Sequence, residues 1–227
     1  GFRSVFLGLF FNVLIMATVT LAIIKLGQIL FGIPAWQCVL FGSIGVVIYA
    51  TLGGLKGVIW ADFFQYSIAM FGAAYTAYVA VQLPEVQAIG GLSGMLGPDS
   101  PIADKLSIFP DPGNLSLVVS MLVIPIAVQW WAVWYPGAEP GGGGYIAQRM
   151  LSAKDEKNAI GATLLFNFMH YAIRPWPWIL VALASLLVFP ELSDIREQFP
   201  GIDDRYLAHD VAYPAMIAKL GPGMLGV

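Results

Sequence analysis

Asp62 carries a carboxylate that lies alone in a long apolar stretch, and it is the clearest candidate for binding an ion. Gln65 follows Asp62 by three positions, so the two side chains share a face if the stretch is helical. A charged side chain at the centre of a membrane helix costs about 2.5–3.5 kcal/mol and normally faces protein or a water-filled cavity. Asp62 also lies only about 12 Å along a helix from Gly54, at 1.5 Å per residue. The residues leave two interpretations open, an ion-coupling acid or an acid anchored at the membrane interface.

A basic pair lies in a second apolar stretch. His170 and Arg174 are four positions apart and therefore share a helical face. A lone histidine in a membrane helix is either a packing residue or a ligand. Arg174 needs a carboxylate, carbonyl groups or water, because burial of its charge alone is costly.

A group of amphipathic side chains lies at the C-terminal end of a third apolar stretch. Its members are Gln129, Trp130, Trp131, Trp134 and Tyr135. Tryptophan and tyrosine gather where a helix leaves the bilayer, so a belt at the headgroups is one interpretation of this group. The wall of a cavity is the other.

Enzyme and nucleic-acid chemistry are not predicted. No group of His, Asp and Glu has metal-ligand spacing, and no nucleophile lies beside a base. The net charge of −3, with no basic run, gives no reason to expect nucleic acid as a partner. The run Gly141–Gly144 lacks the Gly-Lys-Ser/Thr of a phosphate loop and predicts a flexible connection. We therefore expect neither enzyme activity nor an organic cofactor.

The elements that must position these residues are membrane helices. The chain is 58% hydrophobic and only 11% charged, whereas soluble domains carry roughly a quarter charged residues. A bilayer core takes about 20 helical residues, and residues 36–83 are too long an apolar run for one crossing. Gly53-Gly54 is the tight-turn candidate there, because glycine accepts a positive φ. We predict an all-α integral membrane protein, one transmembrane domain over residues 1–227, with spans near 5–32, 35–52, 56–83, 115–135 and 159–189 and a sixth from 211.

Two segments rich in acidic residues, 84–114 and 190–210, are predicted as loops outside the hydrocarbon. Prolines 125, 175 and 177 interrupt the spans, either as simple kinks or as the broken helices by which transporters expose backbone to a cargo. If the spans alternate, more lysines and arginines fall on the side opposite the two acidic segments. That side is then cytoplasmic and both acidic loops are extracytoplasmic.

Two segments carry a resemblance to a known family. Residues 49–65 read Tyr-Ala-Thr-Leu-Gly-Gly-Leu-Lys-Gly-Val-Ile-Trp-Ala-Asp-Phe-Phe-Gln, and residues 148–154 read Gln-Arg-Met-Leu-Ser-Ala-Lys. Both resemble signatures of the sodium:solute symporter family, which includes the sodium–glucose, sodium–proline and sodium–pantothenate transporters. The two segments occur in the family's order and spacing, and the similarity runs along essentially the whole chain.

The resemblance implies a LeuT-type inverted repeat of five plus five helices, with the present spans as core helices three to seven and the start of the eighth. The family's main sodium site lies between core helices one and eight, so we expect no complete sodium site here, and both ends look like cuts in a longer protein. Asp62 and Gln65 are implied in sodium coupling, and His170 stands where sugar-carrying relatives have a lysine. The residues implied in substrate binding or gating are Gln129, Trp131, Trp134, Tyr135 and His170.

The function implied by the resemblance is sodium-coupled symport of a small polar organic solute by alternating access. The protein is then a multi-pass protein of a cell membrane, with sodium, a small solute and the lipid bilayer as partners. The alternative is a sensory transmembrane module of a histidine kinase built on the same fold. The glycine-rich link, residues 136–144, is longer than in the sugar transporters, and cargo identity is not readable from these residues.

Overall fold

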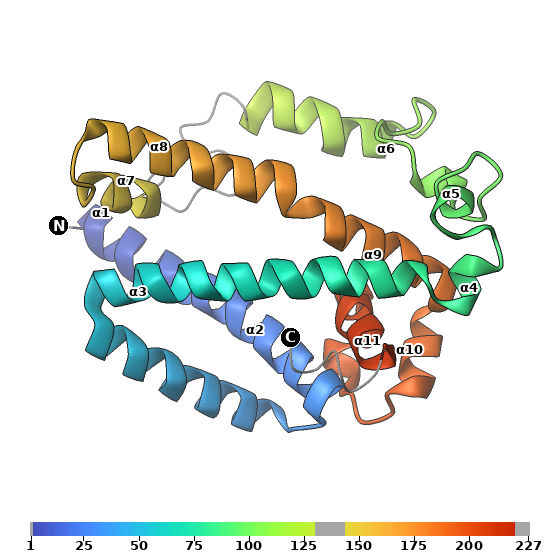
Figure 1. The fold of residues 1–227 in the computed structure, drawn as a ribbon, viewed down its shortest axis with the longest axis horizontal. Helices are drawn as coiled ribbons and strands as arrows, with labels where there is room; N and C mark the ends of the chain where they lie inside the picture. Colours follow the sequence, from blue (N-terminus) through green and yellow to red (C-terminus); the bar gives the residue numbers. More distant parts are fainter. Residues whose placement is uncertain (1, 130–143, 221–227) are drawn as a thin grey trace. The chain divides into compact units, whose positions relative to one another are not determined.

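The computed structural model describes residues 2–129 and 144–220 (Figure 1). Within these ranges the chain forms helices, turns and loops and no strand, which confirms the predicted all-α class. The chain divides into two compact units, residues 1–15 with 104–173, and residues 16–103 with 174–227.

In its described part, the first unit contains several short helical segments, four of which are π-helical. Its elements are α1 (Phe2–Val5), η1 (Phe6–Phe11), α6 (Leu115–Val118), η3 (Val119–Val123), η4 (Pro125–Gln129), α7 (Gly144–Leu151), α8 (Glu156–Asn167) and η5 (Phe168–Ile173). The Asp155 carboxylate begins α8 by accepting a hydrogen bond from the Asn158 backbone N–H at 2.8 Å. A cap of this kind satisfies an otherwise unpaired N–H and is worth about 1 kcal/mol.

The second unit holds the longest helices. Its elements are α3 (Ala35–Val81), α4 (Pro84–Gln87), α5 (Gly91–Met95), α9 (Pro175–Val188), α10 (Leu192–Gln198), η6 (Asp204–Tyr206), η7 (His209–Val211) and α11 (Ala212–Lys219). Two elements cross the sequence boundaries of the units, α2 (Asn12–Phe31) and η2 (Ala103–Lys105).

Helix α3 is two helices joined at a glycine. Gly54 has φ 53° and ψ −160°, and it is the non-helical position inside the 47 residues of α3. The chain turns back on itself there, between the blue and the teal arms of α3 in Figure 1. Residues that carry a side chain rarely adopt this backbone conformation, so glycine is the residue that permits the reversal.

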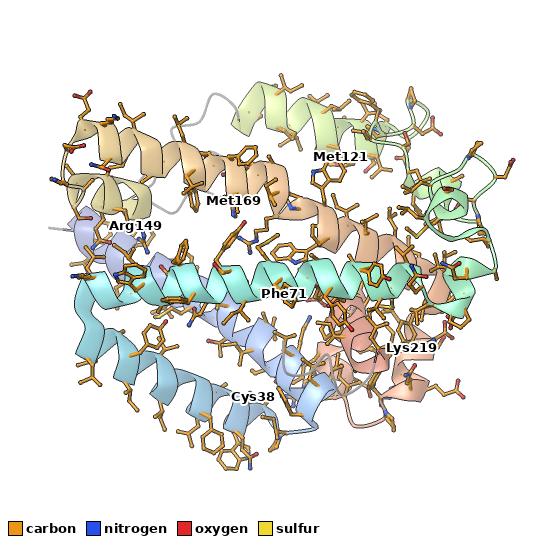
Figure 2. All side chains as sticks on the ribbon, in the orientation of Figure 1. Cys38, Phe71, Met121, Arg149, Met169 and Lys219 are labelled. Atoms are coloured by element: carbon orange, nitrogen blue, oxygen red, sulfur yellow. The ribbon has the colours of Figure 1, made fainter. Side chains whose placement is uncertain are left out.

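Among the residues that the structure describes, and with both arms of α3 counted as one, three helices are long and apolar enough to cross a membrane. They are Val13–Phe31, Ala35–Val81 and Glu156–Val188, and Leu115–Val128 is a shorter apolar helix. Large apolar side chains of these helices are exposed, including Phe71, which is 69% exposed and is labelled in Figure 2. An apolar surface of this extent requires lipid or further helices to cover it.

The buried core of the second unit lies at one end of its long helices. Ile29 of α2, Ala77 and Ala80 of α3 and Val181 and Ala184 of α9 pack there with residues of the two acidic segments. The residues from the acidic segments are Val86, Met95, Ile102, Ile195 and Ile202. These segments, predicted as plain loops, therefore carry short helices and part of the core, because single apolar residues among Gly, Pro and Asp give no helical periodicity to read.

Two long-range ion pairs hold this end of the unit together. The Lys25 Nζ of α2 donates to both carboxylate oxygens of Asp210, at 2.7 and 2.6 Å. The Lys219 Nζ of α11 donates to Glu85 Oε1 at 2.6 Å and lies 5.5 Å from the Phe189 ring centroid. The hydrogen bond from Lys219 lowers the pKa of the Glu85 carboxyl below its usual value.

Candidate functional site

Asp62 and Gln65 lie on the second arm of α3, shortly after the reversal at Gly54. Both side chains are exposed on their unit and line one cavity of about 260 Å³. The other lining residues are Tyr66, Ala69 and Met70 of α3, and Arg174 and Trp178 at the start of α9. The predicted pair of polar residues is therefore brought together at a hollow rather than on a flat apolar face.

Arg174 comes directly before the proline at which α9 begins. The π-helical segment η5 ends at Ile173 and α9 begins at Pro175, so Arg174 is the junction residue. Proline has no backbone N–H to donate and is well tolerated at the first position of a helix, which ends one helical segment and starts the next. The sequence alone related Arg174 to His170 on one face; the structure relates it to Asp62 through their shared cavity.

The cavity therefore contains one formal negative charge and one formal positive charge. The Arg174 guanidinium carbon lies 4.4 Å from the ring centroid of Trp178, four residues further along the chain. A cation over an aromatic face is held by about 0.5–1 kcal/mol at exposed sites and by more where water is excluded. Trp178 was not recognised as a site residue from the sequence, and the signal that finds it is its four-residue spacing from a membrane arginine.

His170 lies in the other unit, in η5, and is half-buried. Its ring stacks on Phe166 at a centroid distance of 5.2 Å and an interplanar angle of 9°. It also meets the Tyr171 ring edge-on at 4.7 Å. The side chain thus contacts one ring of α8 and one ring of η5.

The predicted gate falls largely outside the described residues. Gln129 is the last residue of η4. Trp131, Trp134 and Tyr135 lie outside the described residues, so their role stays a prediction.

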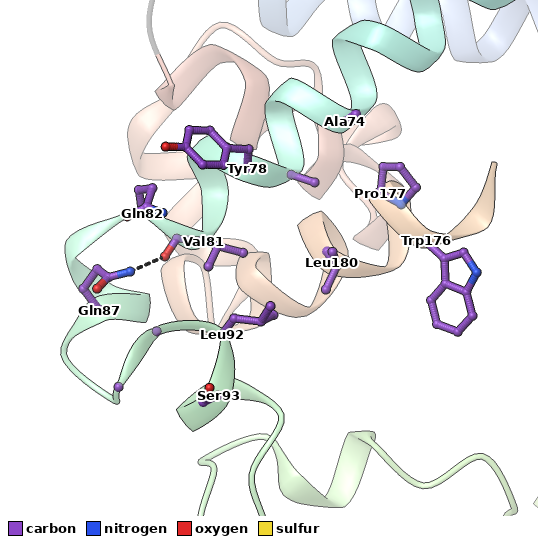
Figure 3. Close-up of a pocket in the computed structure, with 13 residues that line it drawn as sticks. Ala74, Tyr78, Val81, Gln82, Gln87, Leu92, Ser93, Trp176, Pro177 and Leu180 are labelled. Atoms are coloured by element: carbon purple, nitrogen blue, oxygen red, sulfur yellow. Dashed lines mark hydrogen bonds between the residues drawn. The ribbon is translucent and has the colours of Figure 1, made fainter. Parts of the chain in front are cut away.

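A second cavity, of about 670 Å³, lies at the other end of α3 (Figure 3). It is bordered by α3, by Trp176, Pro177 and Leu180 of α9, and by five residues at and between α4 and α5, which are Gln87, Gly90, Gly91, Leu92 and Ser93. Gln87 Nε2 donates to the Val81 carbonyl at 2.8 Å across its rim, drawn as a dashed line in Figure 3. All of the residues that line this cavity are uncharged, so it is suited to neutral rather than ionic groups.

Comparison with known proteins gives one family and two relatives. The profile of the sodium:solute symporter family matches residues 4–226. The sodium-coupled monocarboxylate transporter 1 of Xenopus laevis is 33% identical over 191 residues, which are 78% of this chain and 30% of the relative. The sodium-coupled monocarboxylate transporter 2 of Mus musculus is 26% identical over 202 residues, 86% of this chain and 29% of the relative. The chain thus spans about a third of the length of these relatives, and no solved structure matches it.

Proposed function

Because the chain belongs to the sodium:solute symporter family, we propose that it takes part in sodium-coupled symport of a small organic solute across a membrane. The observation that carries the proposal is the family match over residues 4–226, since an all-helical membrane fold by itself serves many functions. Both relatives are named as transporters, and neither is named as an enzyme.

Asp62 and Gln65 are proposed as the sodium-coupling residues of this chain. Carboxylate and amide oxygens are the ligands that hard cations prefer in proteins. The two side chains line one cavity, which is the arrangement a transient cation site requires. The resemblance places the main sodium site between core helices one and eight, so Asp62 and Gln65 are proposed to act in sodium coupling or release and not to form that main site.

The proposed architecture is the LeuT-type inverted repeat, working by alternating access in a multi-pass protein of a cell membrane. Interrupted helices support it, since transporters of this kind place cargo and ions where helices break. The described chain has such a break at Gly54, and it changes from π-helical to α-helical backbone at Arg174, whose own backbone angles stay helical.

The proposed cargo is a small monocarboxylate, the solute class in the printed names of both relatives. Gln129, Trp131, Trp134, Tyr135 and His170 are the proposed cargo-binding or gating residues. A histidine at position 170, in place of the lysine of the sugar carriers, is compatible with a cargo other than a sugar.

Uptake into proteoliposomes tests the function directly. The reconstituted full-length protein should accumulate radiolabelled lactate or propionate under an inward sodium gradient, and not under a matched potassium gradient. Glucose serves as the control for the sugar-carrier alternative, and succinate as the control for dicarboxylates. Equal uptake with and without the sodium gradient would contradict symport, and it is the result that a purely sensory module predicts.

A further inference from the structure

The cavity that contains Asp62 also contains a cation that belongs to the protein. We propose that Arg174 competes with sodium for Asp62, so that the protein supplies its own counter-ion whenever sodium has left. This inference rests on the proposed function, because it concerns the step in which sodium is bound or released.

The geometry brings the two charges into one small space. Asp62, on the second arm of α3, and Arg174, at the start of α9, line the same cavity of about 260 Å³ within one compact unit. Arginine stays protonated in proteins, so its charge is present in every state of the transport cycle. A sodium ion beside Asp62 and the Arg174 guanidinium carry charges of the same sign and therefore repel one another. Occupation of Asp62 by one cation therefore weakens its occupation by the other.

Trp178 gives the Arg174 guanidinium an interaction partner other than Asp62. The Arg174 guanidinium carbon lies 4.4 Å from the Trp178 ring centroid, and Trp178 lines the same cavity. The face of an indole ring is the best aromatic partner for a cation. When sodium occupies Asp62, Arg174 can remain over Trp178 without leaving the cavity. The side chain thus exchanges between a carboxylate and an aromatic face.

An internal counter-ion lowers the energetic cost of the sodium-free state of the carrier. A carboxylate inside a membrane helix is costly when no cation compensates its charge. With Arg174 in the same cavity, the formal charges of the lining residues cancel, and in this proposal the protein returns to its starting state without carrying sodium back. Arg174 thereby sets sodium affinity, although it provides no oxygen ligand to the ion.

Equilibrium binding of radioactive sodium to the purified full-length protein tests the competition without reference to any cargo. We expect Arg174→Gln to lower the half-saturating sodium concentration by about fivefold or more, the lower end of typical coupling between two sites. Arg174→Lys keeps the charge and should stay closer to the wild type. Arg205→Gln is the matched control, because Arg205 is an exposed arginine of the acidic segment 190–210, paired with Asp203. It should leave sodium affinity unchanged.

Further variants test whether the effect of Arg174 on sodium affinity depends on Trp178 and on Asp62. Trp178→Leu removes the alternative partner of Arg174, so it should raise the half-saturating sodium concentration, and this rise should vanish when Arg174→Gln is also present. In an Asp62→Asn background, Arg174→Gln should give no gain in sodium affinity. The pair Asp62→Asn with Arg174→Gln keeps the cavity neutral and serves as the folding control, checked by size-exclusion chromatography.

The outcomes separate this inference from the function on which it rests. Sodium binding by the wild type with no change in Arg174→Gln overturns the competition alone. The same holds if Arg174→Gln raises the KM for lactate at saturating sodium without altering sodium affinity, since Arg174 is then a cargo residue. A wild type that neither binds sodium nor transports with it removes the proposed function and the competition together.

Discussion

The Lys25 ammonium nitrogen donates to both carboxylate oxygens of Asp210, at 2.7 and 2.6 Å, although 185 residues separate the two in the chain. Lys25 is a buried residue of the apolar helix α2, whereas Asp210 belongs to the short 3₁₀ turn η7. The pair joins a predicted membrane helix to the acidic segment 190–210. Removal of Asp210 leaves a buried ammonium without its main partner.

We expect Asp210→Asn to lower the free energy of unfolding by about 1–3 kcal/mol. Removal of one partner from a fully buried pair costs roughly 3–5 kcal/mol, and the cost here is smaller because the Asp210 side chain is 63% exposed. Thermal unfolding of the purified protein in detergent measures the change. Asp104→Asn, which breaks a pair with Lys105 in which both side chains are exposed, should have no measurable effect. An equal loss of stability in both variants would contradict a specific role for Lys25.

Asp62→Asn should weaken sodium activation of transport more than it weakens cargo binding. The amide keeps the shape of the side chain and removes the charge that attracts a cation. We expect the half-saturating sodium concentration to rise roughly tenfold or more, which corresponds to about 1.4 kcal/mol of lost binding free energy. Sodium activation curves of uptake at saturating cargo make the measurement, and Asp99→Asn in an exposed part of segment 84–114 is the control. An unchanged curve with normal protein levels would leave Asp62 as an interfacial anchor.

Gly54→Ala should destabilise the protein by about 1–3 kcal/mol, the usual cost of forcing a side chain into a sparsely populated backbone region. A Cβ at Gly54 would meet no atom within 4 Å, so the cost comes from the backbone alone. Gly45→Ala is the matched control, since a Cβ at Gly45 also meets nothing and Gly45 has no positive φ. It should be neutral or stabilising by roughly 0.5–1 kcal/mol. Thermal unfolding of the two variants, measured side by side, decides whether the reversal needs glycine.

The Glu85–Lys219 pair predicts a stability change in acid. The pKa of the Glu85 carboxyl is lowered from its ordinary value of 4.5, mainly by the hydrogen bond from Lys219. The stability it contributes is therefore fully present above the ordinary value and is lost as the pH falls through the folded-state pKa. Glu85→Gln should lower the unfolding temperature at neutral pH and flatten its decline as the pH falls below the ordinary value of 4.5. Parallel pH profiles of wild type and Glu85→Gln would contradict this role.

His170 is predicted to tune cargo choice without being needed for folding. Its ring stacks on Phe166 at a centroid distance of 5.2 Å, so His170→Phe keeps the aromatic packing while it removes the ring nitrogens. We expect this variant to keep its unfolding temperature and to change lactate affinity. Wild-type lactate affinity in His170→Phe would assign the side chain to packing.

Local features of the sequence located several elements and one half of the candidate site. The Gly53-Gly54 pair marked the break in α3 because only backbone conformation is at issue there, and glycine is the residue that accepts it. Asp62 stood out because a carboxylate in an apolar stretch is rare for energetic reasons that do not depend on the rest of the fold. The motifs at 49–65 and 148–154 indicated the family, which the profile match confirms.

Only the tertiary structure decided which side chains meet. Arg174 shares its cavity with Asp62 and Trp178 because α9 packs along the second arm of α3, and nothing in the local pattern of either helix specifies that contact. Lys25 with Asp210, and Val86 with the other core residues of segments 84–114 and 190–210, are likewise products of long-range packing. The effects of composition, of glycine positions and of isolated charges are local, so they can be predicted from the sequence. Pairing between distant segments depends on how whole helices pack, and the sequence by itself left it open.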